Sequence, residues 1–253
     1  MLRKEGARQI IKGVIPERYH WAVRSWAARA VHRGSQRYCP CCDSRVRRFR
    51  PYGQDPRADA RCPVCGALER HRLLALLLRR RSELLDGLGQ VLHVAPEGPV
   101  ERVLRGAVRN RYVSIDLAPE HVMAQADITR LPFRDASFDA VYCSHVMEHV
   151  PDDRTALAEM RRVLRPGGWA VFQVPVRGDT TVEDPSVTDP EERLRLFGQR
   201  DHVRIYGHDF ANRLAQARFR VRVERPQYDL PSEAVERYAL LPDEEIFLCR
   251  PVA

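Results

Sequence analysis

Short apolar runs alternate with amphipathic stretches from residue 89 onward. The apolar runs predict strands at 91–94, 111–117, 139–144, 169–176, 219–224 and 245–250. Apolar residues at helical spacing predict intervening helices at 98–106, 118–124, 152–164 and 190–197. This alternation predicts an α/β fold built on a parallel, doubly wound sheet. Ligands of such sheets bind at the carboxyl ends of the strands, where the strand order reverses.

The chain before residue 89 follows a different pattern. We therefore expect an N-terminal region at 1–88 and a separate domain at 89–253. Helical periodicity covers 17–33 and 67–85. The first of these predicted helices has an apolar stripe with arginines between its members, namely Tyr19, Val23, Trp26 and Ala30. The stripe favours packing on the domain over a basic amphipathic helix on a membrane surface.

Membrane and export signals are missing from the sequence pattern. No stretch of 18 apolar residues occurs, and the first 20 residues lack an apolar core of signal-peptide length. We therefore expect a cytoplasmic protein without a transmembrane segment.

Five of the seven cysteines lie in residues 39–65. Two Cys-Pro-x-Cys pairs, Cys39 with Cys42 and Cys62 with Cys65, have the spacing of a tetrahedral zinc site. Each turn directs two thiolates at one ion, and four thiolates leave no open position for catalysis. Disulfides and a redox dithiol are the alternatives, and the missing secretion signal disfavours disulfides.

The other three cysteines have no place in this predicted site. Cys41 has the wrong phase for the first pair. Cys143 and Cys249 lie in apolar runs and are expected to be buried in strands.

The net charge of +8 is unevenly distributed. Residues 1–90 contain 20 basic and 8 acidic residues, whereas the rest of the chain contains 22 and 26. Six arginines lie between the cysteine pairs, namely Arg45, Arg47, Arg48, Arg50, Arg57 and Arg61. They could contact phosphate groups, although an ordinary solvated surface is the simpler interpretation.

Polar residues follow the predicted strands at the edge where a ligand would bind. Asp116 ends the second strand, where a carboxylate can accept both hydroxyls of a ribose. Asp127 and Ile128 come next, and this pair can hold an exocyclic amine and one face of an adenine. Ser144, His145, Glu148 and His149 come at or after the end of the strand at 139–144, where a transferred group would meet its acceptor.

The run from 126 to 172 carries a family resemblance. Its segments LPF, SFDAV, EHV and LRPGG resemble, in order and spacing, the class I S-adenosylmethionine-dependent methyltransferases of the type 11 subgroup. The resemblance implies a Rossmann-like methyltransferase sheet and S-adenosylmethionine as the cofactor. The cofactor-binding candidates are His93, Ala95, Glu97, Asp116, Leu117, Asp127, Ile128 and Ser144.

The first motif departs from this family. His93 stands where the family has an acidic residue, and Ala95 stands at the first glycine of the turn. Glycine there lets the backbone approach the methionine part of the cofactor. We expect cofactor binding with altered geometry, in which Glu97 holds the ammonium group.

Residues 177–207 form a polar insertion after the fifth predicted strand and are expected to cover the substrate. Groups that move protons or bind anions crowd its end. The substrate-binding candidates are Asp201, Arg204, Tyr206 and His208. If the acceptor is a hydroxyl, a histidine is the natural base, and the candidates are His202, His145 and His149.

Three functions fit this sequence. The favoured one is methyl transfer to a small molecule or glycan, at a hydroxyl group. The second is an RNA methyltransferase whose basic zinc knuckle grips phosphates, although only Tyr38, Phe49 and Tyr52 offer aromatic stacking near the knuckle. The third is a non-catalytic scaffold that keeps the methyltransferase fold.

Overall fold

A computed structural model describes residues 16–53, 55–108 and 110–252. The chain divides into two compact units. The N-terminal unit contains residues up to Arg72 together with Pro231–Leu240, and the sheet unit contains Leu73–Leu230 and Leu241–Ala253. The predicted boundary at 88/89 falls inside the sheet unit. The stretch that lacks a signal-peptide core lies mostly outside the described residues.

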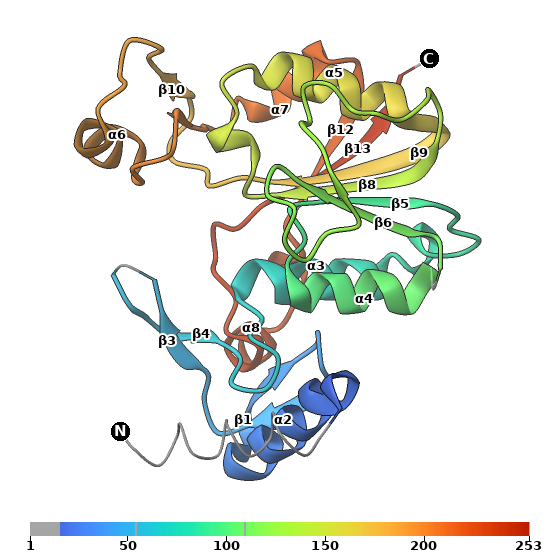
Figure 1. Cartoon of the computed structure of the whole chain (residues 1–253). Coiled ribbons are helices and arrows are strands. Elements are labelled where there is room, and N and C mark those ends of the chain that lie inside the picture. The colour runs from blue at the N-terminus through green and yellow to red at the C-terminus, as the bar shows by residue number, and fades with distance from the viewer. Residues whose placement is uncertain (1–15, 54, 109, 253) are drawn as a thin grey trace. The chain divides into compact units, whose positions relative to one another are not determined.

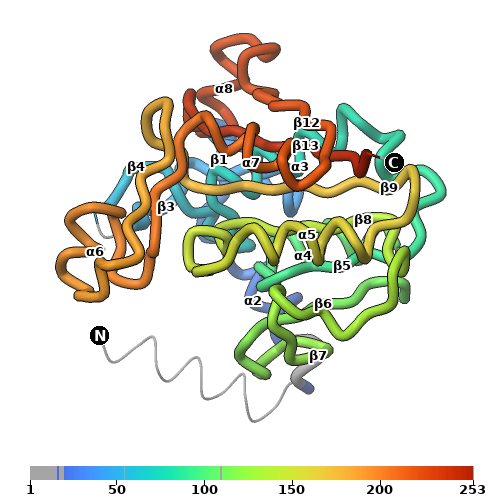
Figure 2. The backbone as a smooth tube through the Cα atoms, turned by 90° about the horizontal axis from the view of Figure 1, so that it is seen from above, coloured from blue at the N-terminus to red at the C-terminus, as the bar shows by residue number. Residues whose placement is uncertain are grey.

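A seven-stranded sheet organises the sheet unit. Its strands are β5 (Val91–Val94), β6 (Tyr112–Asp116), β7 (Ala124–Gln125), β8 (Phe138–Ser144), β9 (Leu164–Gln173), β12 (Phe219–Glu224) and β13 (Ile246–Pro251). They lie in the order β12-β13-β9-β8-β5-β6-β7, and Figure 2 shows the middle strands side by side. Strands β5 to β9 pair in parallel, and β13 is antiparallel to both of its neighbours. The predicted doubly wound fold is confirmed.

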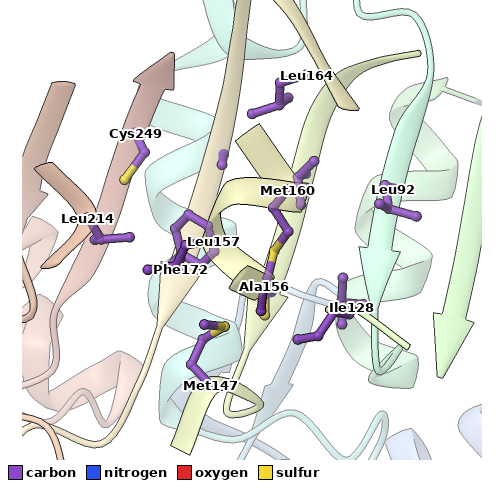
Figure 3. Close-up of a cluster of buried hydrophobic side chains, with 14 of the residues drawn as sticks. Leu92, Ile128, Met147, Ala156, Leu157, Met160, Leu164, Phe172, Leu214 and Cys249 are labelled. Atoms are coloured by element: carbon purple, nitrogen blue, oxygen red, sulfur yellow. The ribbon is translucent and has the colours of Figure 1, made fainter. Parts of the chain in front are cut away.

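Helices cover both faces of this sheet (Figure 1). Helices α5 (Asp153–Val163) and α7 (Phe210–Gln216) lie on one face, and α3 (Glu69–Arg80) and α4 (Gly98–Val108) lie on the other. Three short 3₁₀ turns complete the unit, η1 (Ser82–Leu84), η2 (Met147–His149) and η3 (Pro226–Asp229). Side chains of α5 and α7 form a continuous core with strand residues such as Phe172 and Leu92 (Figure 3). Burial of this apolar surface is the main force that holds the helices on the sheet.

Local sequence signals explain several element boundaries. Asp152 caps α5 by accepting a hydrogen bond from the Thr155 amide at 3.0 Å. Gly168, in the LRPGG segment, lies in β9 where the pairing with β8 is irregular. A Cβ atom at Gly168 would stand 2.8 Å from the carbonyl oxygen of Asp139, so only glycine fits there.

The predicted helix at 118–124 is wrong. These residues form turns that lead into β7. The Asp116 side chain accepts a hydrogen bond from the Ala118 amide at 3.0 Å, and the Met123 amide donates to the Ser114 carbonyl at 3.1 Å. These contacts satisfy the backbone groups that a helix would have paired internally, and they hold the segment against the sheet.

Residues 177–207 form a small excursion with its own elements (Figure 1). It contains β10 (Val182–Glu183), α6 (Pro190–Phe197) and β11 (Arg204–Ile205), and β10 pairs with β11 in antiparallel. Helix α6 begins at the Asp189 cap and ends at Gly198, which has a φ of 86°. A small apolar cluster of Val187, Phe197 and Ile205 supports the excursion.

The N-terminal unit consists of short elements. They are α2 (Glu17–Val31), β1 (Arg33–Cys39), β2 (Ser44–Val46), β3 (Arg50–Tyr52), β4 (Arg57–Arg61) and α8 (Ser232–Tyr238). The predicted stripe of α2 is not its packed face, because Trp26 is 73% exposed and Ala30 is exposed. The Tyr19 side chain lies outside the described part of the chain. Among the described residues, no helix has the length and apolar character needed to cross a membrane.

Candidate active site and cysteine cluster

A cavity of about 380 Å³ opens at the carboxyl ends of the central strands. The chain leaves β5 toward β6 on one side and returns to β8 on the other, so the cavity lies where the strand order reverses. The lining residues come from four loops, at Val94 and Ala95, at Asp116 and Leu117, from Ala126 to Thr129, and at Val146 together with His149–Asp152. Its volume lies in the range of small-molecule and cofactor sites, roughly 300–1,000 Å³.

Two aspartates stand at the rim of this cavity on rigid turns. Asp116 accepts the Ala118 amide, and Asp127 accepts both the amide and the hydroxyl of Thr129 at 2.8 Å. Leu117 is 68% exposed, whereas Ile128 is buried and also belongs to the core (Figure 3). The rim therefore combines fixed hydrogen-bond acceptors with apolar surface, the combination that an adenosine group requires.

Ala95 takes the backbone conformation of a glycine. Its φ is 47°, in the left-handed region, and its amide donates to the Ile115 carbonyl at 2.8 Å. An L-residue in this region costs roughly 1–2 kcal/mol. The departure from the family motif thus preserves the turn and adds strain, and Ala95 lines the cavity as predicted.

His93 does not line the cavity, and its predicted cofactor role stays a prediction. It alternates with Leu92 and Val94 along β5 and therefore faces the opposite side of the sheet. There its ring is fully buried between Tyr112 and Tyr142, with Nδ1 2.7 Å from the Tyr112 hydroxyl. His93 fills space under the sheet.

Glu97 and Ser144 lie outside the lining of the cavity. Glu97 precedes α4, and its carbonyl accepts hydrogen bonds from the first turn of that helix. Ser144 is buried at the end of β8. The cofactor roles assigned to both residues stay predictions.

Three histidines surround the η2 turn. His149 lines the cavity, and its Nδ1 lies 3.2 Å from a carboxylate oxygen of Asp201. The ring of His202 packs edge-on against His149 with a centroid separation of 4.7 Å. His145 has a φ of 53°, and its Nδ1 lies 3.5 Å from the Glu148 carboxylate. The fold thus brings together two of the three predicted bases beside the cavity.

His202 is only 2% exposed, and this burial lowers the pKa of its imidazole. A lowered pKa keeps the ring neutral at pH 7. A neutral imidazole can accept a proton or bind a metal ion.

Arg204 and Tyr206 contact the protein itself, and their assignment to substrate binding stays a prediction. The Arg204 guanidinium donates to the backbone carbonyls of Met147, Val150 and Pro151. The Tyr206 hydroxyl donates to the Asp153 carboxylate at 2.6 Å. Both side chains are buried, and their polar groups form hydrogen bonds with the turn that carries His149 and with neighbouring residues.

The other two predicted substrate residues lie apart from each other. Asp201 is exposed and contacts His149, so it stands near the cavity. Nδ1 of His208 instead lies 3.2 Å from a carboxylate oxygen of Glu245, which also pairs with Arg225. Their substrate roles stay predictions.

Sequence reasoning missed part of the lining after β8. Val146, Val150 and Pro151 line the cavity, although only their polar neighbours were candidates. The signal was present in the EHVPDD run, because a loop that follows a central strand contributes all of its residues to that edge of the sheet. Glu148 was noticed only by its place after the strand, and its carboxylate lies beside both His149 and His202.

The four predicted cysteine ligands meet in the N-terminal unit. Their sulfur atoms all lie within 4.8 Å of one another, with 3.6 Å between Cys39 and Cys65 and 3.9 Å between Cys42 and Cys62. A tetrahedral ion with zinc–sulfur bonds of about 2.3 Å places its sulfurs about 3.8 Å apart. The donor set and spacing therefore fit Zn²⁺.

The remaining cysteines have other surroundings. The Cys41 thiol donates to the His71 carbonyl at 3.3 Å and lies outside the four-sulfur cluster. Cys143 and Cys249 are fully buried in strands, as predicted, and burial raises the pKa of both thiols. Buried neutral thiols of this kind are unreactive.

The methyl-transfer family resemblance is supported by comparison with known proteins. Residues 87–172 match the family described as "Methyltransferase domain". This part of the chain is therefore similar to methyltransferase domains. The whole lining of the cavity, from Val94 to Asp152, falls within this part, whereas His202 and the excursion lie outside it.

Two curated relatives match parts of the chain. The O-methyltransferase cnsE of Penicillium expansum is 36% identical over 96 residues, which cover 38% of this chain and 33% of the relative. Methyltransferase GfsG of Streptomyces halstedii is 40% identical over 109 residues, which cover 42% of this chain and 35% of the relative. The matches therefore span about a third of the length of these relatives.

A solved structure shares the fold of the methyltransferase domain. The Haemonchus contortus N-methyltransferase in complex with phosphomonomethylethanolamine and S-adenosylhomocysteine aligns with a TM-score of 0.50 and 16% identity. The alignment covers 75% of this chain and 54% of that one. At this identity the likeness is one of fold.

Proposed function

We propose that this chain is an S-adenosylmethionine-dependent methyltransferase that methylates a hydroxyl group of a small molecule or glycan. The observation that carries the proposal is the cavity at the strand-order reversal of a methyltransferase domain, with Asp116 and Asp127 at its rim. The name of one relative, an O-methyltransferase, supports oxygen as the acceptor atom.

The residues of the cavity suit the parts of this cofactor. The Asp116 carboxylate would accept the ribose hydroxyls, and Asp127 would accept the exocyclic amine of the adenine. Leu117 and Ile128 supply apolar surface for the two faces of the adenine ring. The bound cofactor would supply a methyl group on a positively charged sulfur. The protein's task is then to align the acceptor with that methyl group.

The acceptor side of the site falls to the residues after β8 and to the excursion. His149 lines the cavity, and His202 packs on its ring. Both imidazoles stand where a neutral nitrogen can act on the acceptor hydroxyl. Asp201, which contacts His149, would hold that ring in one orientation.

We further propose that the cysteine cluster binds a structural zinc ion. Cys39, Cys42, Cys62 and Cys65 would fill all four tetrahedral positions, so the ion would fold the N-terminal unit and take no part in methyl transfer. None of the seven cysteines forms a disulfide in the structure, and a reducing compartment such as the cytoplasm would keep the four ligands available.

Calorimetric titration with S-adenosylhomocysteine tests the main proposal. The full chain should bind this product with measurable heat. Asp116→Ala should weaken binding at least tenfold, because hydrogen bonds to a charged group contribute about 1.5–3 kcal/mol. Asp229→Ala, at an exposed aspartate that pairs with Arg80 away from the cavity, serves as the matched control and should bind like wild type. No binding by folded wild type would refute the proposal.

RNA is the second candidate substrate, and one observation favours it. A cavity of about 850 Å³ in the N-terminal unit is lined by Arg47, Arg48 and Arg50, all exposed, beside the aromatic ring of Phe49. If this surface binds phosphates, affinity for a structured RNA should fall steeply as salt rises. A lack of RNA binding even at low salt would remove this candidate.

A further inference from the structure

Glu148, His149 and His202 form a second group of possible metal ligands. Each offers one ligand atom, and these atoms lie within 4.8 Å of one another. Donors around a tetrahedral ion with bonds of about 2.1 Å lie about 3.4 Å apart, so side-chain rotations are needed to bring all three onto one ion. Glu148 is 1% exposed, so its carboxylate is shielded from water.

The two imidazoles are oriented as metal ligands usually are. Nδ1 of His202 lies 3.1 Å from the Phe197 carbonyl, and Nδ1 of His149 lies 3.2 Å from the Asp201 carboxylate. A neutral ring that donates from Nδ1 to such an acceptor presents the lone pair of Nε2. Outer contacts with carbonyls and carboxylates are the usual means of fixing the tautomer of a metal-binding histidine.

A second observation points to a missing occupant. Nε2 of His202 is buried and has no hydrogen-bond partner in the described part of the chain. Buried polar atoms are nearly always satisfied by protein, water or an ion. This nitrogen belongs to His202, the third member of the group formed with Glu148 and His149.

The backbone holds these three residues in place. The Val203 amide donates to the Glu148 carbonyl at 2.9 Å, which fixes the residue after His202 against the η2 turn. The buried Arg204 then clamps the carbonyls on either side of His149. The cluster is therefore preorganised, as a metal site requires.

We propose that Glu148, His149 and His202 bind one divalent transition-metal ion of the Zn²⁺ type beside the cofactor cavity. Two histidines and one carboxylate suit such ions, and three protein ligands leave coordination positions open. His149 lines the cavity, so an open position lies next to it. The structure assigns that position to the acceptor hydroxyl, a role that rests on the proposed methyl transfer.

The chemistry of this arrangement balances without a further reagent. A hydroxyl on the ion loses its proton to water, because a bound cation lowers the pKa of the oxygen it holds. The oxygen then forms a bond to the methyl carbon as the carbon–sulfur bond of the sulfonium breaks. The products are the methyl ether and S-adenosylhomocysteine.

Zinc content of the full chain tests the site. Wild type, His149→Gln and His202→Gln are each equilibrated with excess Zn²⁺, desalted and measured for zinc per chain by elemental analysis. Wild type should retain one ion more than either variant. His121→Gln, at an exposed histidine in the turn before β7, is the matched control and should retain as much zinc as wild type. The result is the difference in zinc content between wild type and each variant. Zinc on the cysteine cluster is the same in all of them and cancels.

Cobalt distinguishes the two kinds of site. Co²⁺ on the four cysteines gives a thiolate-to-cobalt charge-transfer band, whereas Co²⁺ on histidine and carboxylate gives none. Wild type should take up Co²⁺ beyond the amount that saturates this band, with at least tenfold weaker uptake in His149→Gln. His149 is partly exposed, so His149→Gln is expected to fold. If folded wild type and folded His149→Gln take up equal amounts of zinc and of cobalt, the proposed metal site is wrong.

S-adenosylhomocysteine titration of the same samples separates the two proposals. Product binding without the extra ion means that the metal site fails while the methyltransferase assignment stands. An extra ion without product binding leaves the metal site standing, and only its role in methyl transfer falls.

Discussion

The cysteine cluster and the histidine–carboxylate cluster are built in opposite ways. The four cysteines lie within residues 39–65, and each pair closes its own tight turn. The histidine–carboxylate cluster joins the η2 turn to His202, which lies far along the chain in the excursion. Buried side chains of Arg204 and Tyr206 hold its two parts together.

This difference determines what each cluster depends on. A small unit with little apolar core needs its ion to fold, because the ion replaces the missing packing energy. A cluster on a packed sheet is positioned by its neighbours before any ion arrives. Loss of metal should therefore unfold the cysteine cluster and leave the histidine–carboxylate cluster in place. Loss of packing should disrupt the histidine–carboxylate cluster and leave the cysteine cluster in place.

The largest effect is expected from Cys62→Ser. Structural zinc in small units is worth about 10–16 kcal/mol of apparent binding energy, and most of this is coupled to folding. The variant should lose one zinc ion, and its N-terminal unit should be cleaved rapidly in limited proteolysis while the sheet unit stays resistant.

Cys41→Ser is the matched control for that experiment, because Cys41 is adjacent to the cluster and outside it. It should keep the zinc of wild type. If it loses zinc as Cys62→Ser does, the assignment of the four ligands is wrong.

The next largest effect is expected from Arg204→Met. The substitution keeps the length of the side chain and removes its hydrogen bonds to the carbonyls after β8 and to Glu183. Breaking a buried charged network typically costs about 3–5 kcal/mol. Urea unfolding of the sheet unit should show this loss.

Arg200→Met supplies the comparison, since Arg200 pairs only with the exposed Glu191 among the contacts of the described chain. Its effect on the unfolding free energy should be much smaller, because an exposed ion pair contributes little to stability. Equal effects of the two substitutions would mean that Arg204 does not clamp the turn.

The same network predicts a pH dependence. Hydrogen bonds from Arg213, and also from Arg204, lower the pKa of Glu183 from 4.5 to about 2. A depressed pKa in the folded state means stabilisation that is complete above pH 4.5 and is lost as the pH falls toward 2. The difference in unfolding free energy between wild type and Glu183→Gln should shrink over this range.

Denaturant titrations of both proteins at several pH values measure this difference. Acid also protonates the cysteine cluster, but it does so in both proteins, so the difference isolates Glu183. A difference that stays constant between pH 6 and pH 2.5 would contradict the assigned ion pairs.

The sequence predicts local features of this chain accurately and tertiary ones poorly. The bounds of β5, β12 and α6 match their predicted ranges. A short, mostly apolar run, a run that alternates apolar and polar residues, and a Pro-initiated, Gly-terminated helix are each complete local signals. The cysteine cluster also depends on local spacing, and its sulfurs meet as expected.

The contacts that the sequence does not reveal share one physical cause. Arg204 and Tyr206 are polar and sit in a loop-like stretch, so the pattern favours a substrate role. Their partners are carbonyls and a carboxylate some fifty residues earlier, which periodicity cannot reveal. The surroundings of His93 are hidden for a related reason, because its partners Tyr112 and Tyr142 lie on adjacent strands.

The smallest expected effect concerns Ala95, where a local signal and its structural outcome can be separated. Its φ of 47° belongs to glycine, so Ala95→Gly should raise the unfolding free energy by about 1 kcal/mol, seen as a higher Tm. Ala158→Gly, on the exposed side of α5, should lower it by about 0.5–1 kcal/mol, because glycine weakens a regular helix. Opposite signs at the two alanines show that the turn of the methyltransferase domain keeps glycine geometry without glycine. A loss of stability in both variants would mean that packing of the Ala95 side chain stabilises the fold by more than the strain of its backbone destabilises it. Packing, and not tolerated strain, would then explain why alanine can replace the family's glycine here.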